Sequence, residues 1–226
     1  MEQTRILGAW NVTCVSYVSD GSPSYRLDWK TTIINVIKYG TNVETTITIG
    51  IGVEKITIND INLLVIDEGG RSRARVFHSF RYRGTSGMIV VIDSADRENI
   101  DNLRYELFNI FDEVECQNRS LLVFANKQDL PNAMSLGEIK DRLNLSKLNK
   151  NIKWHLQPAC AIRNEGLHEG FQCLLSILAI LLPPIAAIIK VGCTKHFFLN
   201  ILLTLLGLLP GCIHALWLVW RSSPAE

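Results

Sequence analysis

An amide, an amine and a carboxylate follow a short apolar run near the middle of the chain. The run Leu121–Ala125 is apolar throughout and rich in β-formers, which is typical of a buried parallel strand. Asn126, Lys127 and Asp129 come directly after it. Pro131 then ends the regular backbone. Because α/β proteins bind ligands at the carboxyl ends of parallel strands, these side chains are expected in a ligand-binding crevice.

The carboxylate of Asp129 suits one base in particular. It can accept two N–H bonds from one edge of guanine, whereas adenine has no such pair of donors, and the carboxylate lone pairs would be left unpaired. Asn126 can brace neighbouring loops, and the stem of Lys127 can lie over the base. The alternative is a polar turn without a ligand. The position of these residues directly after a strand favours the nucleotide.

This stretch resembles the guanine-specificity motif of small GTPases, and Leu121–Ala133 resembles the Arf (ADP-ribosylation factor) branch. The resemblance is continuous over about residues 30–172. It implies a P-loop-type α/β fold with a doubly wound, mostly parallel sheet. Cys160-Ala161-Ile162 is similar to the C-A-T of the family, in which Cys160 and Ala161 line the nucleotide and the Ala161 N–H would bond guanine O6.

The phosphate-binding loop departs most from the family pattern G-x-x-x-x-G-K-[ST]. In that motif, backbone N–H groups wrap the phosphates, the Lys bonds the outer phosphates and the hydroxyl reaches Mg²⁺. Lys30, Thr31 and Thr32 match the end of the motif, with Thr31 as the Mg²⁺ ligand. Ser24 and Trp29 occupy the glycine positions, and Trp29 is bulky where the backbone should close on phosphate. The alternative is a helix N-terminus with no ligand.

Two segments resemble the nucleotide-sensing switches of the family. Thr45–Gly50 resembles switch I, in which Thr48 would complete the Mg²⁺ shell and sense the γ-phosphate. Asp67–Arg71 resembles the D-x-G-G-Q of switch II. There Asp67 would hold Mg²⁺ through water, and the Gly70 N–H would meet the γ-phosphate.

Arg71 stands where the family has the Gln that orients the attacking water. An Arg side chain has no acceptor, so it cannot position a water through one. Intrinsic hydrolysis is therefore predicted to be lost or very slow even if GTP binds, and no catalytic residue is assigned.

The charges are distributed unevenly along the chain. The net charge of +1 gives no argument for nucleic acid as a partner. The six cysteines contain no C-x-x-C pair, which fits reduced thiols on the cytosolic side. The few charged residues that follow residue 172 are Lys190, Lys195, Arg221 and Glu226.

The tail, residues 173–221, contains two apolar segments. Cys173–Ile189 has no charge and is interrupted by Pro183-Pro184, whereas Phe197–Trp220 is 24 residues long. The second segment is long enough to span a hydrocarbon core of ~30 Å, and the first is marginal. The tail is therefore predicted to be a two-helix transmembrane hairpin.

Residues 177–221 also resemble the small plasma-membrane proteolipids (stress-induced hydrophobic peptides). The resemblance is carried by Leu182–Pro184, Phe197–Gly207 and Pro210–Leu216. It implies two transmembrane segments and a role in membrane potential or cation homeostasis. No carboxylate lies in either apolar segment, so the residues themselves show no ion pathway.

These features predict a divergent N-terminal segment (1–29), an Arf-like guanine-nucleotide-binding domain (30–172) and the membrane hairpin (173–221). The predicted function is a membrane-anchored, vesicle-trafficking type of switch, integral to the membrane with its nucleotide-binding domain facing the cytosol. The resemblance implies GTP/GDP, Mg²⁺, membrane lipid, exchange factors, GTPase activators and effectors. One alternative is a non-enzymatic proteolipid with a degenerate binding domain. Another is an artificial joining of two genes with a mis-assembled start.

Overall fold

The computed structural model describes residues 9–16, 29–39, 51–58, 61–68, 86–112, 119–148, 150–181, 186–187, 194–206 and 208–220. The strands among them are β1 (Ala9–Ser16), β2 (Ile51–Ile58), β3 (Ile61–Glu68), β4 (Gly87–Asp93), β5 (Ser120–Asn126) and β6 (Lys153–Pro158). The α-helices are α1 (Trp29–Tyr39), α3 (Ile100–Asp112), α4 (Leu136–Arg142), α5 (Leu167–Leu181), α7 (Lys195–Leu206) and α8 (Leu208–Trp220). Short 3₁₀ turns are η4 (Leu145–Lys147) and η5 (Ala161–Arg163).

The strands form one sheet in the order β2-β3-β1-β4-β5-β6. Only the β2–β3 pair is antiparallel, so the carboxyl ends of the other strands meet at one edge of the sheet. In this register, Asp93 at the end of β4 lies beside Asn126 at the end of β5. The predicted mostly parallel α/β sheet is confirmed, and its carboxyl edge carries the polar residues singled out in the sequence.

The N-terminal segment supplies the central strand of the sheet. β1 lies between β3 and β4 and is parallel to both, although it precedes the part of the chain that carries the Arf resemblance. Its register places Cys14 beside Asp67 of β3. Residues 9–16 are therefore part of the same sheet as the segments that carry the Arf resemblance.

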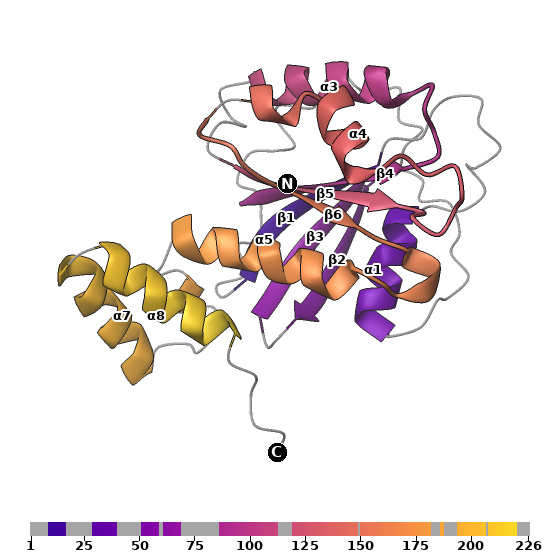
Figure 1. Ribbon diagram of the computed structural model, residues 1–226. Coiled ribbons are helices and arrows are strands. Elements are labelled where there is room, and N and C mark those ends of the chain that lie inside the picture. Colours follow the sequence, from indigo (N-terminus) through magenta and orange to yellow (C-terminus); the bar gives the residue numbers. More distant parts are fainter. Residues whose placement is uncertain are drawn as a thin grey trace.

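Helices cover both faces of the sheet, with α3 and α4 on one side and α1 and α5 on the other (Figure 1). β5 is buried along its whole length. Its side chains alternate: Leu122 and Phe124 pack in the core with α1 and α5, whereas Leu121, Val123 and Ala125 pack with α3 and α4. Burial on both faces explains the uninterrupted apolar run in the sequence.

Helix α5 packs closely against β5 because position 170 is glycine. A Cβ at Gly170 would lie 2.4 Å from Cε1 of Phe124, which is closer than real Cβ contacts allow. Gly166 precedes the helix with φ of 75°, a left-handed conformation that favours glycine. The two glycines thus fix how the chain passes from β6 into α5.

The second apolar segment folds back on itself. The side-chain amide of Asn200 in α7 lies 3.1 Å from Nδ1 of His214 in α8, and it donates to the Gly211 carbonyl at 3.0 Å. In one continuous helix, residues 200 and 214 would be about 21 Å apart along the axis. The single helix predicted over Phe197–Trp220 was therefore wrong. The chain forms two helices because Pro210 lacks an N–H and fits only in a first turn, which α8 provides.

Among the helices that the structure describes, none combines the length and the apolar character needed to cross a bilayer. Helix α8 packs against α5. The Cys212 thiol donates to the Ile180 carbonyl at 3.4 Å, and the Trp220 indole N–H donates to the Ser176 hydroxyl at 3.0 Å. Ala215 and Val219 are buried in the same core as α1 and α5. Helix α8 thus shares its core with the sheet domain.

Candidate nucleotide-binding site

Asn126 joins the loops that follow β5 and β6. Its side chain is 2% exposed, and Oδ1 accepts the backbone N–H of Ala161 at 2.9 Å. Two backbone bonds flank this contact, from Gln128 N–H to the Ala159 carbonyl and from Ala159 N–H to the Ala125 carbonyl. The other end of the amide, Nδ2, is buried and has no hydrogen-bond partner within the described part of the chain. A buried donor of this kind is suited to a group supplied by a ligand or a neighbouring loop.

Ala161 begins the η5 turn, and its N–H is engaged by Asn126. The predicted bond from this N–H to guanine O6 would therefore have to be shared with the Asn126 oxygen. Sharing one N–H between two acceptors is common at helix termini. The O6 contact remains a prediction.

The Asp129 carboxylate faces the loop after β6. Its Oδ1 accepts from the Cys160 thiol at 3.2 Å, and its Oδ2 lies 4.0 Å from the Arg163 guanidinium. Burial raises the pKa of the Cys160 thiol, and the neighbouring Asp129 carboxylate raises it further, so the thiol stays protonated and donates. A carboxylate offers about four lone-pair sites, which leaves capacity for the two donors of guanine.

Lys127 is held by a residue that the sequence analysis missed. Its ammonium forms an ion pair with Oδ2 of Asp93, and both side chains are largely buried. The other carboxylate oxygen of Asp93 accepts the Ala95 N–H at 2.9 Å. The sequence signal was the position of Asp93 at the end of β4, since ends of neighbouring parallel strands meet at one edge. This pair restrains the Lys127 side chain. The backbone of Lys127 is left-handed, with φ of 64°.

Gln128, the unspecified position of the motif, ties the base loop to the loop after β4. Its side-chain N–H₂ donates to the Ser94 hydroxyl at 2.8 Å and to the Met134 carbonyl at 3.2 Å. Ser94 is fully buried, and its backbone bonds both Asn126 and Met134. The loops after β4 and β5 therefore form one hydrogen-bonded unit.

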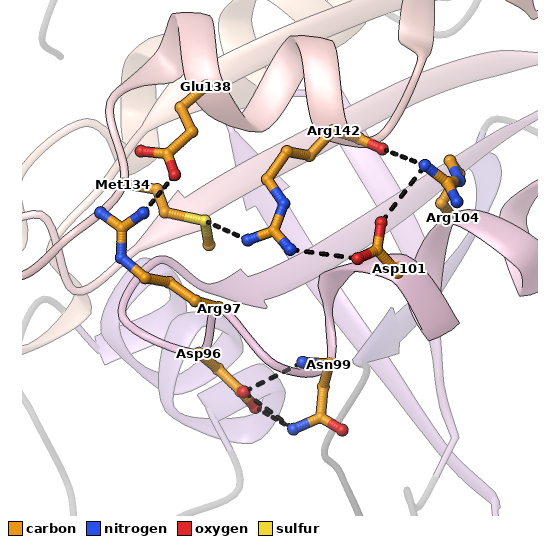
Figure 2. Close-up of polar contacts among 8 residues, drawn as sticks. All are labelled: Asp96, Arg97, Asn99, Asp101, Arg104, Met134, Glu138 and Arg142. Carbon is orange, nitrogen blue, oxygen red and sulfur yellow. Dashed lines mark hydrogen bonds and ion pairs between the residues drawn. The ribbon is translucent and has the colours of Figure 1, made fainter.

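An ionic network on the outer surface joins α3 to α4 behind this unit (Figure 2). Arg97 pairs with Glu138, and Arg142 pairs with Asp101 at 3.0 Å. Asp101 also accepts from Arg104 at 3.2 Å. Individual exposed pairs contribute only about 0–1 kcal/mol, so the network mainly restrains the relative position of the two helices.

On the phosphate side of the site, the side chain of Thr32 is described and is buried, whereas the other predicted residues are described in their backbone alone or not at all. Helix α1 begins at Trp29, so Lys30, Thr31 and Thr32 lie in its first turn, where free N–H groups can bind anions. Asp67 lies near the carboxyl end of β3, beside β1. Thr48, Gly70, Arg71 and the side chains of Lys30, Thr31 and Asp67 lie outside the described residues. The structure therefore brings together the residues predicted to contact the base, and both their contacts and the Mg²⁺ ligands remain predictions.

Residues 27–178 match the family model of the ADP-ribosylation factor family. The chain belongs to the ADP-ribosylation factor family. In addition, residues 172–220 match the family described as proteolipid membrane potential modulator, so both resemblances noted in the sequence are confirmed. The two matches meet in α5.

The fold of this Arf-family chain is shared with a solved small GTPase. The Arl6 BBS3 small GTPase from Trypanosoma brucei, solved with the nucleotide analogue GppNp, superposes with a TM-score of 0.64. The match covers 76% of this chain and 98% of that chain at 24% sequence identity. Membership of the Arf family implies a guanine nucleotide as ligand, together with regulators and effectors.

Proposed function

We propose that this Arf-family protein binds GDP and GTP at the loops after β4, β5 and β6 and is held at a membrane by its apolar tail. The observation that carries the nucleotide half is the bond from Ala161 N–H to Asn126, which joins positions 35 residues apart. It fixes the two base-contacting loops relative to each other, with the Asp129 carboxylate between them. The proposed site for the base would therefore be assembled before a nucleotide arrives.

Asp129 would supply the specificity. Its carboxylate would accept the ring N–H and the exocyclic amine of guanine. With adenine the same oxygens would face no donors, and sites of this kind reject such analogues by roughly 10⁴-fold or more. The Asp93–Lys127 pair would hold the Lys127 stem beside the base.

We further propose that Thr31, Thr48 and Asp67 hold Mg²⁺ and that hydrolysis is slow because Arg71 replaces the water-orienting Gln. The GTP-bound form would then be long-lived. Such a protein would act in vesicle trafficking as a switch that depends on GTPase activators, or as a locked scaffold for effectors. Exchange factors would set how fast GDP leaves.

The proposed membrane attachment is supported by the outer surface of the α7–α8 hairpin. The polar side chain of Asn200 is turned inside the hairpin and is fully buried. Apart from Lys195 at the start of α7, the exposed large side chains described on the two helices are apolar: Phe198, Leu199, Leu202, Leu205, Leu206, Leu209, Ile213, Trp217 and Trp220. A continuous exposed apolar surface of this size is unusual for a protein surrounded by water and fits a lipid environment. The nucleotide-binding domain would face the cytosol.

The nucleotide half is tested by equilibrium binding to the full chain in detergent micelles. Fluorescent GDP, GTP and ADP would be titrated in the presence of Mg²⁺, beside the Asp129→Ala variant. Micromolar or tighter binding of both guanine nucleotides that Asp129→Ala abolishes would support the proposal. Failure of a folded chain to bind any nucleotide would overturn it and favour the alternative of a proteolipid with a non-enzymatic binding domain.

Slow hydrolysis is tested separately. Arg71→Gln restores an acceptor that can orient water, so its single-turnover rate of GTP hydrolysis should exceed that of the wild type. Equal rates would contradict the role assigned to position 71. Membrane attachment is tested by flotation of the full chain with lipid vesicles, where a chain that remains at the bottom of the gradient would refute it.

A further inference from the structure

The tail leaves the domain at the end opposite the nucleotide edge, which is the carboxyl edge of the sheet at which nucleotide binding is proposed (Figure 1). Helix α5 starts beyond the carboxyl end of β6 and runs back along the strand. Its last turns, at Ile177 and Ile180, therefore lie beside the first residues of β6. The α8 helix begins to pack at the same place, since Cys212 donates to the Ile180 carbonyl.

A pocket of ≈ 380 Å³ lies at this junction. Its described lining is Ile152, Lys153, Trp154, Ile177 and Ile180. Ile180 is 48% exposed, so the pocket opens next to the exposed face of the tail. The volume is in the range of small-molecule sites, and the lining is apolar apart from a single amine.

Positive charge is concentrated in the segment that leads into β6, and one of its lysines, Lys153, lines the pocket. Lys147, Lys150 and Lys153 precede or begin β6, are exposed, and form no ion pair with any described residue. The sequence contains no acidic residue between Asp141 and Glu165 that could neutralise them. A fourth lysine, Lys140, lies over the Trp154 ring at 5.8 Å.

We propose that this end of the domain is a lipid-docking surface: Lys147, Lys150 and Lys153 bind the headgroup of an anionic phospholipid, and the pocket takes one of its acyl chains. This proposal rests on the proposed membrane attachment and adds its lipid selectivity. An inorganic anion would make no favourable contact with the apolar walls, and a neutral apolar molecule would make no ionic contact with the lysines. Only an amphiphile with an anionic head matches both.

The docking surface also sets the orientation of the protein. The lysines and the tail would meet the bilayer together. The loops after β4, β5 and β6 would then point away from the membrane, towards cytosolic partners.

The test uses the full chain in lipid nanodiscs made from phosphatidylcholine alone or from phosphatidylcholine with phosphatidylserine. Amide hydrogen exchange is measured for residues 145–153 and, as an internal reference, for residues 128–135 at the nucleotide edge. The variant replaces Lys147, Lys150 and Lys153 by Gln. Lys55→Gln on β2, at the far edge of the sheet, is the matched control.

We expect slower exchange of residues 145–153 only in discs that contain phosphatidylserine. Each lysine near an anionic surface contributes enough to shift the contact by about fivefold, so the triple variant should lose this protection and Lys55→Gln should keep it. High salt should weaken it. Residues 128–135 should exchange equally in both discs.

The acyl-chain half is measured in discs with brominated acyl chains, which quench nearby tryptophans. Wild type should lose more fluorescence than Trp154→Phe, since the tail tryptophans are common to both. A chain that enters the discs but shows equal exchange of residues 145–153 in both lipids, or no quenching of Trp154, would overturn the docking proposal alone. A chain that fails to enter either disc would overturn the membrane attachment itself.

Discussion

Replacing Asn126 by Ala tests the bond that joins the loops after β5 and β6, which are proposed to contact the base. Asn126 Oδ1 accepts the Ala161 N–H at 2.9 Å, and both residues are at most 2% exposed. The substitution leaves the Ala161 N–H buried without that acceptor, which costs about 1–3 kcal/mol. The lost Nδ2 has no partner among the described residues, so its removal adds little. The free energy of unfolding should therefore fall by about 1–3 kcal/mol.

This fall is measured by thermal unfolding of the full chain in detergent. For a domain of this size each kcal/mol lowers Tm by about 2–4 °C. Amide hydrogen exchange at Ala161 should accelerate in the same variant. Asp129→Asn is the matched control, because it alters the neighbouring side chain of the site and leaves the Asn126–Ala161 bond intact. An Asn126→Ala protein with the Tm and Ala161 exchange of the wild type would refute the role given to this bond.

Three further substitutions or treatments follow from the site. Lys127→Met leaves the largely buried Asp93 carboxylate without its cation, so the affinity for GDP should fall by tenfold or more. Fluorescent-nucleotide titration measures this change, and Lys55→Met should leave the affinity unchanged. Burial raises the pKa of the Cys160 thiol, so little thiolate forms until the pH exceeds the ordinary pKa of cysteine. Alkylation of Cys160, followed by mass spectrometry, should therefore be slower at pH 8 than in an unfolded control. Equal rates would contradict a buried thiol donor. Gly166→Ala places a Cβ 2.0 Å from the Pro158 carbonyl oxygen at φ of 75°, so the free energy of unfolding should fall by more than about 2 kcal/mol in chemical denaturation, and a neutral effect would show that the turn differs from the one described.

The sequence was sufficient for the features that depend on local pattern. The apolar run before Asn126 predicted β5 because a strand buried on both faces needs no alternation. The family resemblance then predicted the mostly parallel sheet correctly. The position of the loop after β6 was also predicted this way, since Cys160 and Ala161 follow β6 after one intervening residue, Ala159.

Contacts between residues far apart in the sequence could not be predicted from the local sequence pattern. The position of Asp93 at the end of β4 indicates the carboxyl edge of the sheet, but its pairing with Lys127, 34 residues later, exists only once β4 and β5 lie side by side. The prediction of one helix in the tail was wrong for the same reason. The length of Phe197–Trp220 suggested one helix, whereas the contact between Asn200 and His214 requires a fold-back that hydropathy cannot register.

Base specificity is the most direct test of the central claim that Asp129 selects guanine. Xanthine carries a carbonyl where guanine carries the exocyclic amine. Asp129→Asn replaces a pair of acceptors by one acceptor and one donor, which matches xanthine and mismatches guanine. Competition of GDP and xanthosine diphosphate against a fluorescent nucleotide on the full chain should show a wild type that prefers GDP and a variant that prefers the xanthine nucleotide, each by about 10–100-fold. Equal preference in the two proteins would mean that the Asp129 carboxylate does not contact the base.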